Sequence, residues 1–99
     1  MKQVITAVVR DKRGRILATA QNSYVKTHPL MAREAKAVGE PQKIYLHAEV
    51  AALLRTNWDD AYSIFVSRYS NSGEPLLARP CKICQRVIKL AGIKEVSHT

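Results

Sequence analysis

The sequence predicts a single α/β domain covering residues 1–99, in which helices flank a mixed β-sheet in three layers. Three observations lead to this prediction. Apolar, β-branched segments alternate along the chain with segments of helical periodicity. A short turn with a glycine separates the first two β-rich segments. A chain of 99 residues allows only one hydrophobic core.

The first two strands are expected at residues 3–10 and 16–23. "QVITAVVR" is rich in strand-forming residues, "DKRGR" supplies Gly14 for a turn, and "ILATAQNS" returns as the second strand of a hairpin. The N-terminal segment has no small-residue cleavage site of the kind that follows a signal peptide. We therefore expect a strand here and a cytoplasmic protein.

The central part of the chain contains one uncertain and two clear elements. Pro29 and the Gly39/Pro41 pair bracket a segment that is either a short helix or an irregular connection. "HAEVAALLRT" predicts a helix over residues 47–56, and "YSIFVSRY" predicts a buried strand over residues 62–69.

The last third of the chain predicts a loop, a helix and a strand. "SNSGEPLLARP" has the composition of a loop. Pro80 is expected to be the first residue of a helix that runs to about Leu90 and ends at Gly92. "IKEVSHT" is expected to form a short final strand.

The net charge of +8 favours anionic partners. It is compatible with a solvated basic surface, with a phosphorylated small substrate, or with nucleic acid. On the C-terminal helix, Lys82, Arg86 and Lys89 form either a solvated face or a basic stripe beside a site. No apolar run reaches the roughly 18 residues that a membrane span requires, so no membrane partner is expected.

Cys81 and Cys84 are the only cysteines, and their spacing is typical of metal or redox chemistry. A disulfide across three residues of a helix would be strained. At positions i and i+3 the two thiols face the same side of the predicted helix, at its start, where thiolates are favoured. Two thiolates supply half of a tetrahedral zinc site.

Any further ligand must be a histidine or a carboxylate. His47 lies at the start of a predicted helix, whereas His28 precedes a proline in a loop and His98 lies in the C-terminal segment. A set of His47, Cys81 and Cys84 leaves one open position, as catalytic zinc sites do; a closed structural site would need His28 as the fourth ligand.

Glu49 stands two residues after His47 and directly before an apolar run. A carboxylate buried there is costly unless it is paired or takes part in chemistry. Beside a metal-activated water it could accept a proton and later deliver it to a leaving amine. The alternative is an ordinary glutamate in the first turn of a helix.

Together, "HAE" and "PCKIC" resemble the zinc-dependent nucleobase deaminases, which include cytidine, deoxycytidylate, tRNA adenosine and APOBEC-type deaminases. The resemblance covers nearly the whole chain and implies a cytidine-deaminase-like fold. It implies one zinc ion per chain, held by His47, Cys81 and Cys84, with Glu49 as the proton carrier. It further implies that the backbone N–H of Ala48 binds the base carbonyl, and that Asn22 contacts the sugar or base; otherwise Asn22 is a turn residue.

Several residues near this motif are candidates for substrate binding. Arg79 departs from the Ser, Thr or Glu that is common before "PC", and it is either a surface residue or a ligand for a substrate phosphate. In "YVKTHP", Tyr24 could stack on a base, Lys26 could meet a phosphate and His28 could line the pocket mouth. Otherwise this segment is a solvated loop.

The predicted function is hydrolytic deamination of cytosine to uracil in a nucleotide or nucleoside, with a deoxycytidylate-type substrate favoured. "HAE" resembles the nucleotide and polynucleotide branches of the family, and "PCKIC…AGIKEV" resembles deoxycytidylate deaminases more than tRNA adenosine deaminases. One alternative is deamination of cytosine or adenine within single-stranded DNA or RNA, and another is a non-catalytic, zinc-stabilised binding module. Because the core is small, a homo-oligomer is expected.

Overall fold

The computed structural model describes residues 4–99. Its elements follow in the order β1 (Ile5–Arg10), β2 (Ile16–Gln21), α1 (Pro29–Ala37), α2 (Ala48–Leu54), β3 (Ser63–Tyr69), β4 (Pro75–Leu76), α3 (Lys82–Leu90) and β5 (Glu95–His98). No helix within residues 4–99 is long and apolar enough to span a bilayer.

The five strands form one mixed sheet. Strands β2, β1, β3 and β4 neighbour one another in that order through antiparallel pairs, and β5 pairs with β3 in parallel. The expected hairpin is confirmed: β1 and β2 pair directly, with a register shift between Val9 and Arg10. Asp11 closes the turn, because its carboxylate accepts hydrogen bonds from the backbone N–H groups of Arg13 and Arg15, each at 2.9 Å.

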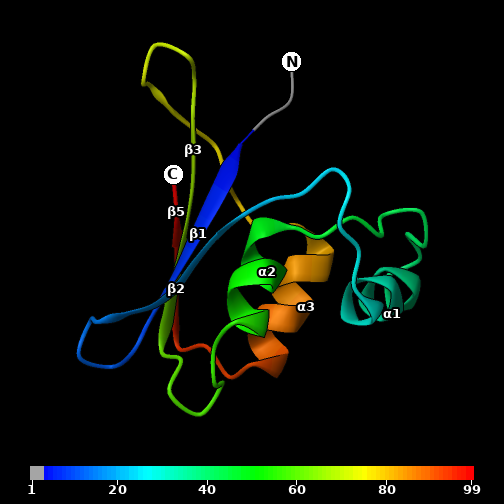
Figure 1. Ribbon diagram of the computed structural model, residues 1–99, viewed down its shortest axis with the longest axis horizontal. Helices are drawn as coiled ribbons and strands as arrows, with labels where there is room; N and C mark the ends of the chain where they lie inside the picture. Colours follow the sequence, from blue (N-terminus) through cyan, green and yellow to red (C-terminus); the bar gives the residue numbers. More distant parts are fainter. Residues whose placement is uncertain (1–3) are drawn as a thin grey trace.

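All three helices lie on one side of the sheet (Figure 1). Helix α2 contacts β1, β2 and β3, α3 contacts α2, and α1 contacts α3. The sheet, the α2–α3 pair and α1 thus follow one another as three layers. The prediction of a mixed sheet with helices packed against it is confirmed, but the helices do not flank the sheet on both faces within the described chain.

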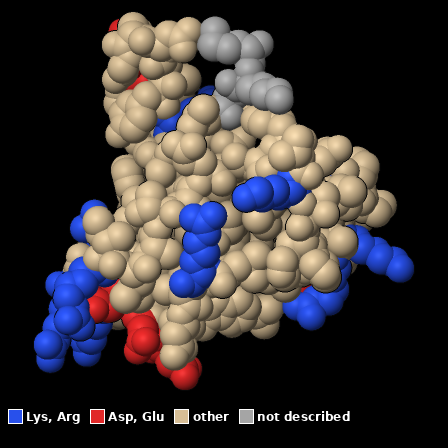
Figure 2. Space-filling model, viewed as in Figure 1, with Lys and Arg blue, Asp and Glu red and all other residues tan. Residues whose placement is uncertain are grey.

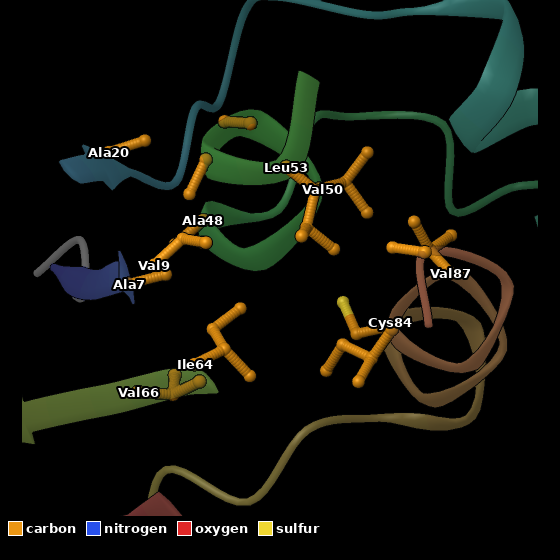
Figure 3. Packing of buried hydrophobic residues seen from close by; sticks show 14 of the residues in the cluster. Ala7, Val9, Ala20, Ala48, Val50, Leu53, Ile64, Val66, Cys84 and Val87 are labelled. Carbon is orange, nitrogen blue, oxygen red and sulfur yellow. The ribbon is translucent and has the colours of Figure 1, made fainter. Parts of the chain in front are cut away.

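The core fills the space between the sheet and helices α2 and α3 (Figure 3). Alternate residues of β1 and β3 point toward the helices, as the two-residue period of a strand requires. The fully or almost fully buried side chains include Ala7, Val9, Val50, Leu53, Ile64, Val66, Ile83, Cys84 and Val87. Cys84 is therefore part of the core as well as a candidate ligand, so its thiol is rigidly placed.

The segment that the sequence predicted as either a short helix or an irregular connection is a helix, α1. It begins at Pro29, with His28 as its N-cap, and ends before Gly39, whose φ of 79° is one that glycine adopts readily. The buried Glu34 joins it to α3, because Arg86 Nε donates a hydrogen bond of 2.7 Å to its carboxylate. Arg86 thus has a structural ion pair rather than a place in a free basic stripe.

Several predicted boundaries need correction. Pro80 is not the first residue of α3, which begins at Lys82 because Cys81 has an extended backbone with ψ of 173°. Strand β4 lies in a segment predicted to be a loop; its two residues pair with the end of β3. The first residue of the predicted strand 3–10, Gln3, lies outside the described residues.

Candidate metal centre

Three donor side chains come together where α2 and α3 begin. His47 is the N-cap of α2, Cys81 is the N-cap of α3, and Cys84 is the third helical residue of α3. An N-cap side chain folds back over the first turn of its helix, where it meets the residue three positions later. The Cys-x-x-Cys spacing thus places both thiols together although the first lies outside the helix.

The distances within this trio suit a metal ion. His47 Nδ1 lies 3.2 Å from Cys84 Sγ and 3.4 Å from Cys81 Sγ. All three donor atoms lie within 4.8 Å of one another, and they are the only group of at least three His, Cys, Asp or Glu donors so arranged within residues 4–99. The sulfur of Cys84 points from α3 toward the space between α2 and β3 (Figure 3).

The two thiols differ in acidity. A hydrogen bond with the Cys84 thiol is the main cause that lowers the pKa of Cys81 to about 3, and His47 lowers it further. The pKa of Cys84 is raised well above its ordinary value by the adjoining Cys81 and by burial. The hydrogen bond with Cys81 raises the pKa of His47, against the effect of burial. Cys81 therefore favours its thiolate form, whereas Cys84 and His47 favour their protonated forms, and a cation would compete with protons for the three donors.

Glu49 lies in the first turn of α2, beside the donor trio. It is 5% exposed, and burial raises the pKa of its carboxyl group above the ordinary value. Contact with the Cys84 thiol and with the charge of His47 opposes that rise. Burial thus favours the protonated form of the Glu49 carboxyl group, which makes Glu49 a candidate for proton transfer.

A pocket of about 490 Å³ opens onto these groups. Its floor includes His47, Ala48, Glu49 and Cys81. Its size fits the 300–1,000 Å³ range common for small-molecule sites. The arrangement can therefore hold a metal ion beside a proton-exchanging carboxyl group in a cavity open to a small organic ligand.

Four of the six predicted substrate-binding residues line this pocket: Asn22, Tyr24, Ala48 and Arg79. The side-chain oxygen of Asn22 accepts a hydrogen bond of 2.9 Å from the N–H of Ile5, so Asn22 also fixes the end of β2 against β1.

The other two lie elsewhere. Lys26 lines a neighbouring hollow. His28 caps α1, where its Nδ1 accepts a hydrogen bond of 3.0 Å from the N–H of Leu30, and it does not line the pocket. His28 is also absent from the donor group, so the closed four-ligand alternative has no support in the described residues. His98 is exposed on β5.

Sequence reasoning missed three conspicuous pocket residues, Lys43, Tyr45 and Arg68. Lys43 and Tyr45 could have been found, because they lie within four residues of His47 in the sequence. Arg68 carried no such signal; it reaches the pocket because it lies on the helix side of β3, two residues beyond the buried Val66. The pocket is therefore lined by three Lys or Arg side chains: Lys43, Arg68 and Arg79.

A scan against protein-family models and a search of curated proteins each found no match. The assignment of this site therefore rests on its motif and geometry.

Proposed function

We propose that this protein is a zinc-dependent deaminase with a cytidine-deaminase-like fold, which hydrolyses the exocyclic amine of cytosine in a nucleotide. A deoxycytidylate-type nucleotide is the simplest substrate of this class. The observation that carries the proposal is the buried Glu49 beside three metal-binding donors, at the floor of an open pocket. A structural metal site requires neither the buried acid nor the pocket.

The donor trio fits zinc. Zinc–nitrogen and zinc–sulfur bonds of about 2.0–2.3 Å at tetrahedral angles imply a nitrogen-to-sulfur separation of about 3.6 Å. The separations of 3.2 and 3.4 Å from His47 Nδ1 are close to this value, and slight expansion would complete the geometry. One imidazole and two thiols leave the fourth position open, as in catalytic zinc sites. When bound there, zinc would supply a Lewis acid that makes a water molecule nucleophilic near neutral pH.

Glu49 would perform the proton transfers. Its carboxylate takes a proton from the attacking water, whose oxygen forms a bond to C4 of the base. As the C4=N3 double bond opens, the same carboxyl group passes that proton to N3; it then carries the remaining hydroxyl proton to the amine, the bond between C4 and the amine nitrogen breaks, C4=O forms and ammonia leaves. The net reaction consumes one water and converts cytosine to uracil. The raised pKa of Glu49 suits a group that must both accept and return a proton.

The remaining pocket residues would orient the nucleotide. Tyr24 and Tyr45 offer aromatic faces for the base or sugar, and Arg79, Arg68 and Lys43 offer charges for a phosphate. Ala48 lines the pocket, and its backbone N–H would donate to the base carbonyl. This surplus of basic residues favours a nucleotide over a nucleoside.

The second candidate function is deamination of a base within a single strand of DNA or RNA. It is favoured by the net charge of +8, which exceeds what one phosphate requires. Figure 2 shows basic side chains spread over one face of the molecule, while the acidic ones gather mainly near the β1–β2 turn.

The proposal is tested by metal analysis followed by incubation with substrates. Zinc-loaded protein is incubated separately with dCMP, cytidine and single-stranded oligonucleotides, and the products are identified by mass spectrometry. We expect conversion of dCMP to dUMP. Stoichiometric zinc without conversion of any of the three substrates would refute the enzymatic proposal and favour a zinc-stabilised binding module.

A further inference from the structure

The sulfur atoms of Cys81 and Cys84 lie within 4.8 Å of each other. Both thiols were expected within one helix, where a disulfide between them would be strained. The structure removes the reason for that strain, because Cys81 precedes α3 and has an extended backbone with ψ of 173°, so that only Cys84 is fixed by the helix. The carbonyl of Cys81 accepts a hydrogen bond of 2.8 Å from the N–H of Gln85. Its side chain can turn toward Cys84 while this bond, and with it the first turn of α3, stays intact.

The two thiols differ in their access to solvent. Cys81 is half-buried and lines the pocket beside Glu49, whereas Cys84 is fully buried in the core (Figure 3). A dissolved oxidant that enters the pocket therefore meets Cys81 first. Redox-active cysteines are typically accessible and lie next to a second thiol that resolves the first product. Disulfide oxidoreductases use the same Cys-x-x-Cys spacing for this purpose.

The charge of the pocket favours an anionic oxidant. Lys43, Arg68 and Arg79 line it together with Cys81, and Glu49 is the only acidic residue among its described lining residues. Glutathione disulfide is a small disulfide with a net negative charge at neutral pH. The basic residues around the pocket would raise the concentration of such a molecule near Cys81.

We propose that Cys81 and Cys84 are a thiol–disulfide redox site, which forms a reversible intramolecular disulfide when no metal occupies the donor trio. This site is a second activity of the same residues, and it does not depend on the deaminase function. A disulfide removes two of the three donors and leaves only His47, so the oxidised protein would not hold zinc. Because the thiolate is both the nucleophile and the metal ligand, zinc and the oxidant compete for the same sulfur atoms.

The reaction with glutathione disulfide takes two exchange steps. In the first, the Cys81 thiolate attacks one sulfur of the oxidant, the sulfur–sulfur bond of the oxidant breaks, and a glutathione thiolate leaves and takes a proton from water. In the second, Cys84 gives up its proton and attacks the Cys81 sulfur. The Cys81–Cys84 bond forms, and the second glutathione thiolate leaves and takes up the proton that Cys84 released. The protein is oxidised, and one glutathione disulfide is reduced to two molecules of glutathione.

The bond should be easy to reduce again. It closes a loop only from Cys81 to Cys84, and closing so short a loop removes little entropy from the unfolded chain. The disulfide would therefore add little to stability. Disulfides that are strained or have an accessible sulfur have higher reduction potentials than structural ones, and they are the labile or regulatory ones. We expect dithiothreitol to reduce the bond and zinc to bind again afterwards.

Mass spectrometry of the whole protein tests the redox site. Metal-free and zinc-loaded proteins are incubated with glutathione disulfide and quenched with an alkylating reagent at several times. We expect the metal-free wild type to lose two hydrogen atoms and to accept no alkyl group, and dithiothreitol to restore both thiols and stoichiometric zinc. At a free zinc concentration of about ten times its Kd, about one site in eleven is empty, so oxidation should be about tenfold slower.

Two single variants separate the roles of the thiols. Cys84→Ser keeps the accessible thiol and lacks the one that resolves the mixed disulfide, so it should accumulate a stable adduct of one glutathione at Cys81. The matched control, Cys81→Ser, keeps only the buried thiol and should form this adduct much more slowly.

A metal-free wild type that keeps two alkylatable thiols, or that stops at a glutathione adduct, would overturn the proposal, and this result needs no substitution in the core. Zinc-loaded protein that is oxidised as fast as metal-free protein would also overturn it, because zinc would then not compete for the sulfur atoms. Masses and zinc content are measured without any deaminase substrate. Failure of the redox site and failure of the deaminase are therefore separate results.

Discussion

Replacement of Glu49 by glutamine tests the site most directly. The amide has the shape of the carboxyl group but cannot take a proton. Glu49 is 5% exposed and lies outside the donor trio, so the variant should keep its fold and its metal. We expect kcat for dCMP to fall by about 10²–10⁴-fold, the usual loss when a general acid–base is removed.

The same variant should be more stable than the wild type in the metal-free state. Burial raises the pKa of Glu49 above its ordinary value of 4.5, so the folded state binds more protons than the unfolded state. The free energy of unfolding of the wild type therefore falls as pH rises from about 4.5 through the pKa of the folded state. Each pH unit by which the pKa of folded Glu49 exceeds 4.5 lowers the free energy of unfolding of the ionised protein by about 1.4 kcal/mol. The glutamine variant has no ionisable group there and avoids this loss.

Three measurements on each protein check this prediction: zinc content, steady-state kinetics with dCMP, and urea unfolding of metal-free protein at several pH values. The matched control is Glu34→Gln, which alters the other buried acid at a distance from the pocket. The control should keep its kcat. Near wild-type turnover in Glu49→Gln would refute the proton-transfer role, and loss of zinc or of stability would show that Glu49 is structural.

Three further predictions follow from the described contacts. Cys84→Ala should lose stoichiometric zinc, whereas His28→Ala should retain it; zinc loss on removing His28 would restore the closed-site alternative. Arg79→Gln should raise KM for dCMP and change turnover of cytidine little, because only dCMP has a phosphate; equal effects on both would contradict a phosphate contact. Glu34→Gln should lower the free energy of unfolding by about 1 kcal/mol at neutral pH, through loss of its hydrogen bond with Arg86. Because Arg86 lowers the pKa of Glu34, this deficit should vanish as pH falls from 4.5 through the pKa of the folded state, and a deficit independent of pH would exclude the ion pair as its cause.

Local patterns in the sequence were sufficient to predict most of the fold and the three side chains that come together as a possible metal site. Alternating apolar residues predicted the hairpin and β3, and Gly92 ended α3 as expected, with φ of 77°. The Cys-x-x-Cys spacing predicted two thiols on one side, which holds although Cys81 precedes the helix. These features depend on neighbours within about four residues, so they can be read from the sequence.

Features that depend on distant contacts could not be predicted in this way. All three helices lie on one side of the sheet because α2 packs on the strands, α3 packs on α2 and α1 packs on α3. Arg68 became a pocket residue only through the pairing of β3 with β1, which brings the end of β3 beside the start of β1. Lys26 follows Asn22 closely in sequence, yet the turn at Ser23 directs it to the adjoining hollow.

The donor trio and the outer wall of the pocket depend on different parts of the fold. Cys84 is fully buried, and His47 and Cys81 begin helices that pack in the core. In contrast, the wall bearing Tyr24 and Tyr45 consists of two loops joined by backbone hydrogen bonds, among them a bond of 2.8 Å from the Ser23 N–H to the Leu46 carbonyl.

The side chains of the loop wall can change without moving the donor trio. Substitutions of Tyr24 or Tyr45 alter side chains at the pocket rim, while the backbone bonds that hold the loops remain. The metal donors keep their positions, because these are set by the starts of α2 and α3. Rigid elements thus fix the donor geometry, and loops present the groups that contact a ligand. We therefore expect substitutions in these loops to change ligand preference without altering the geometry of the donor trio.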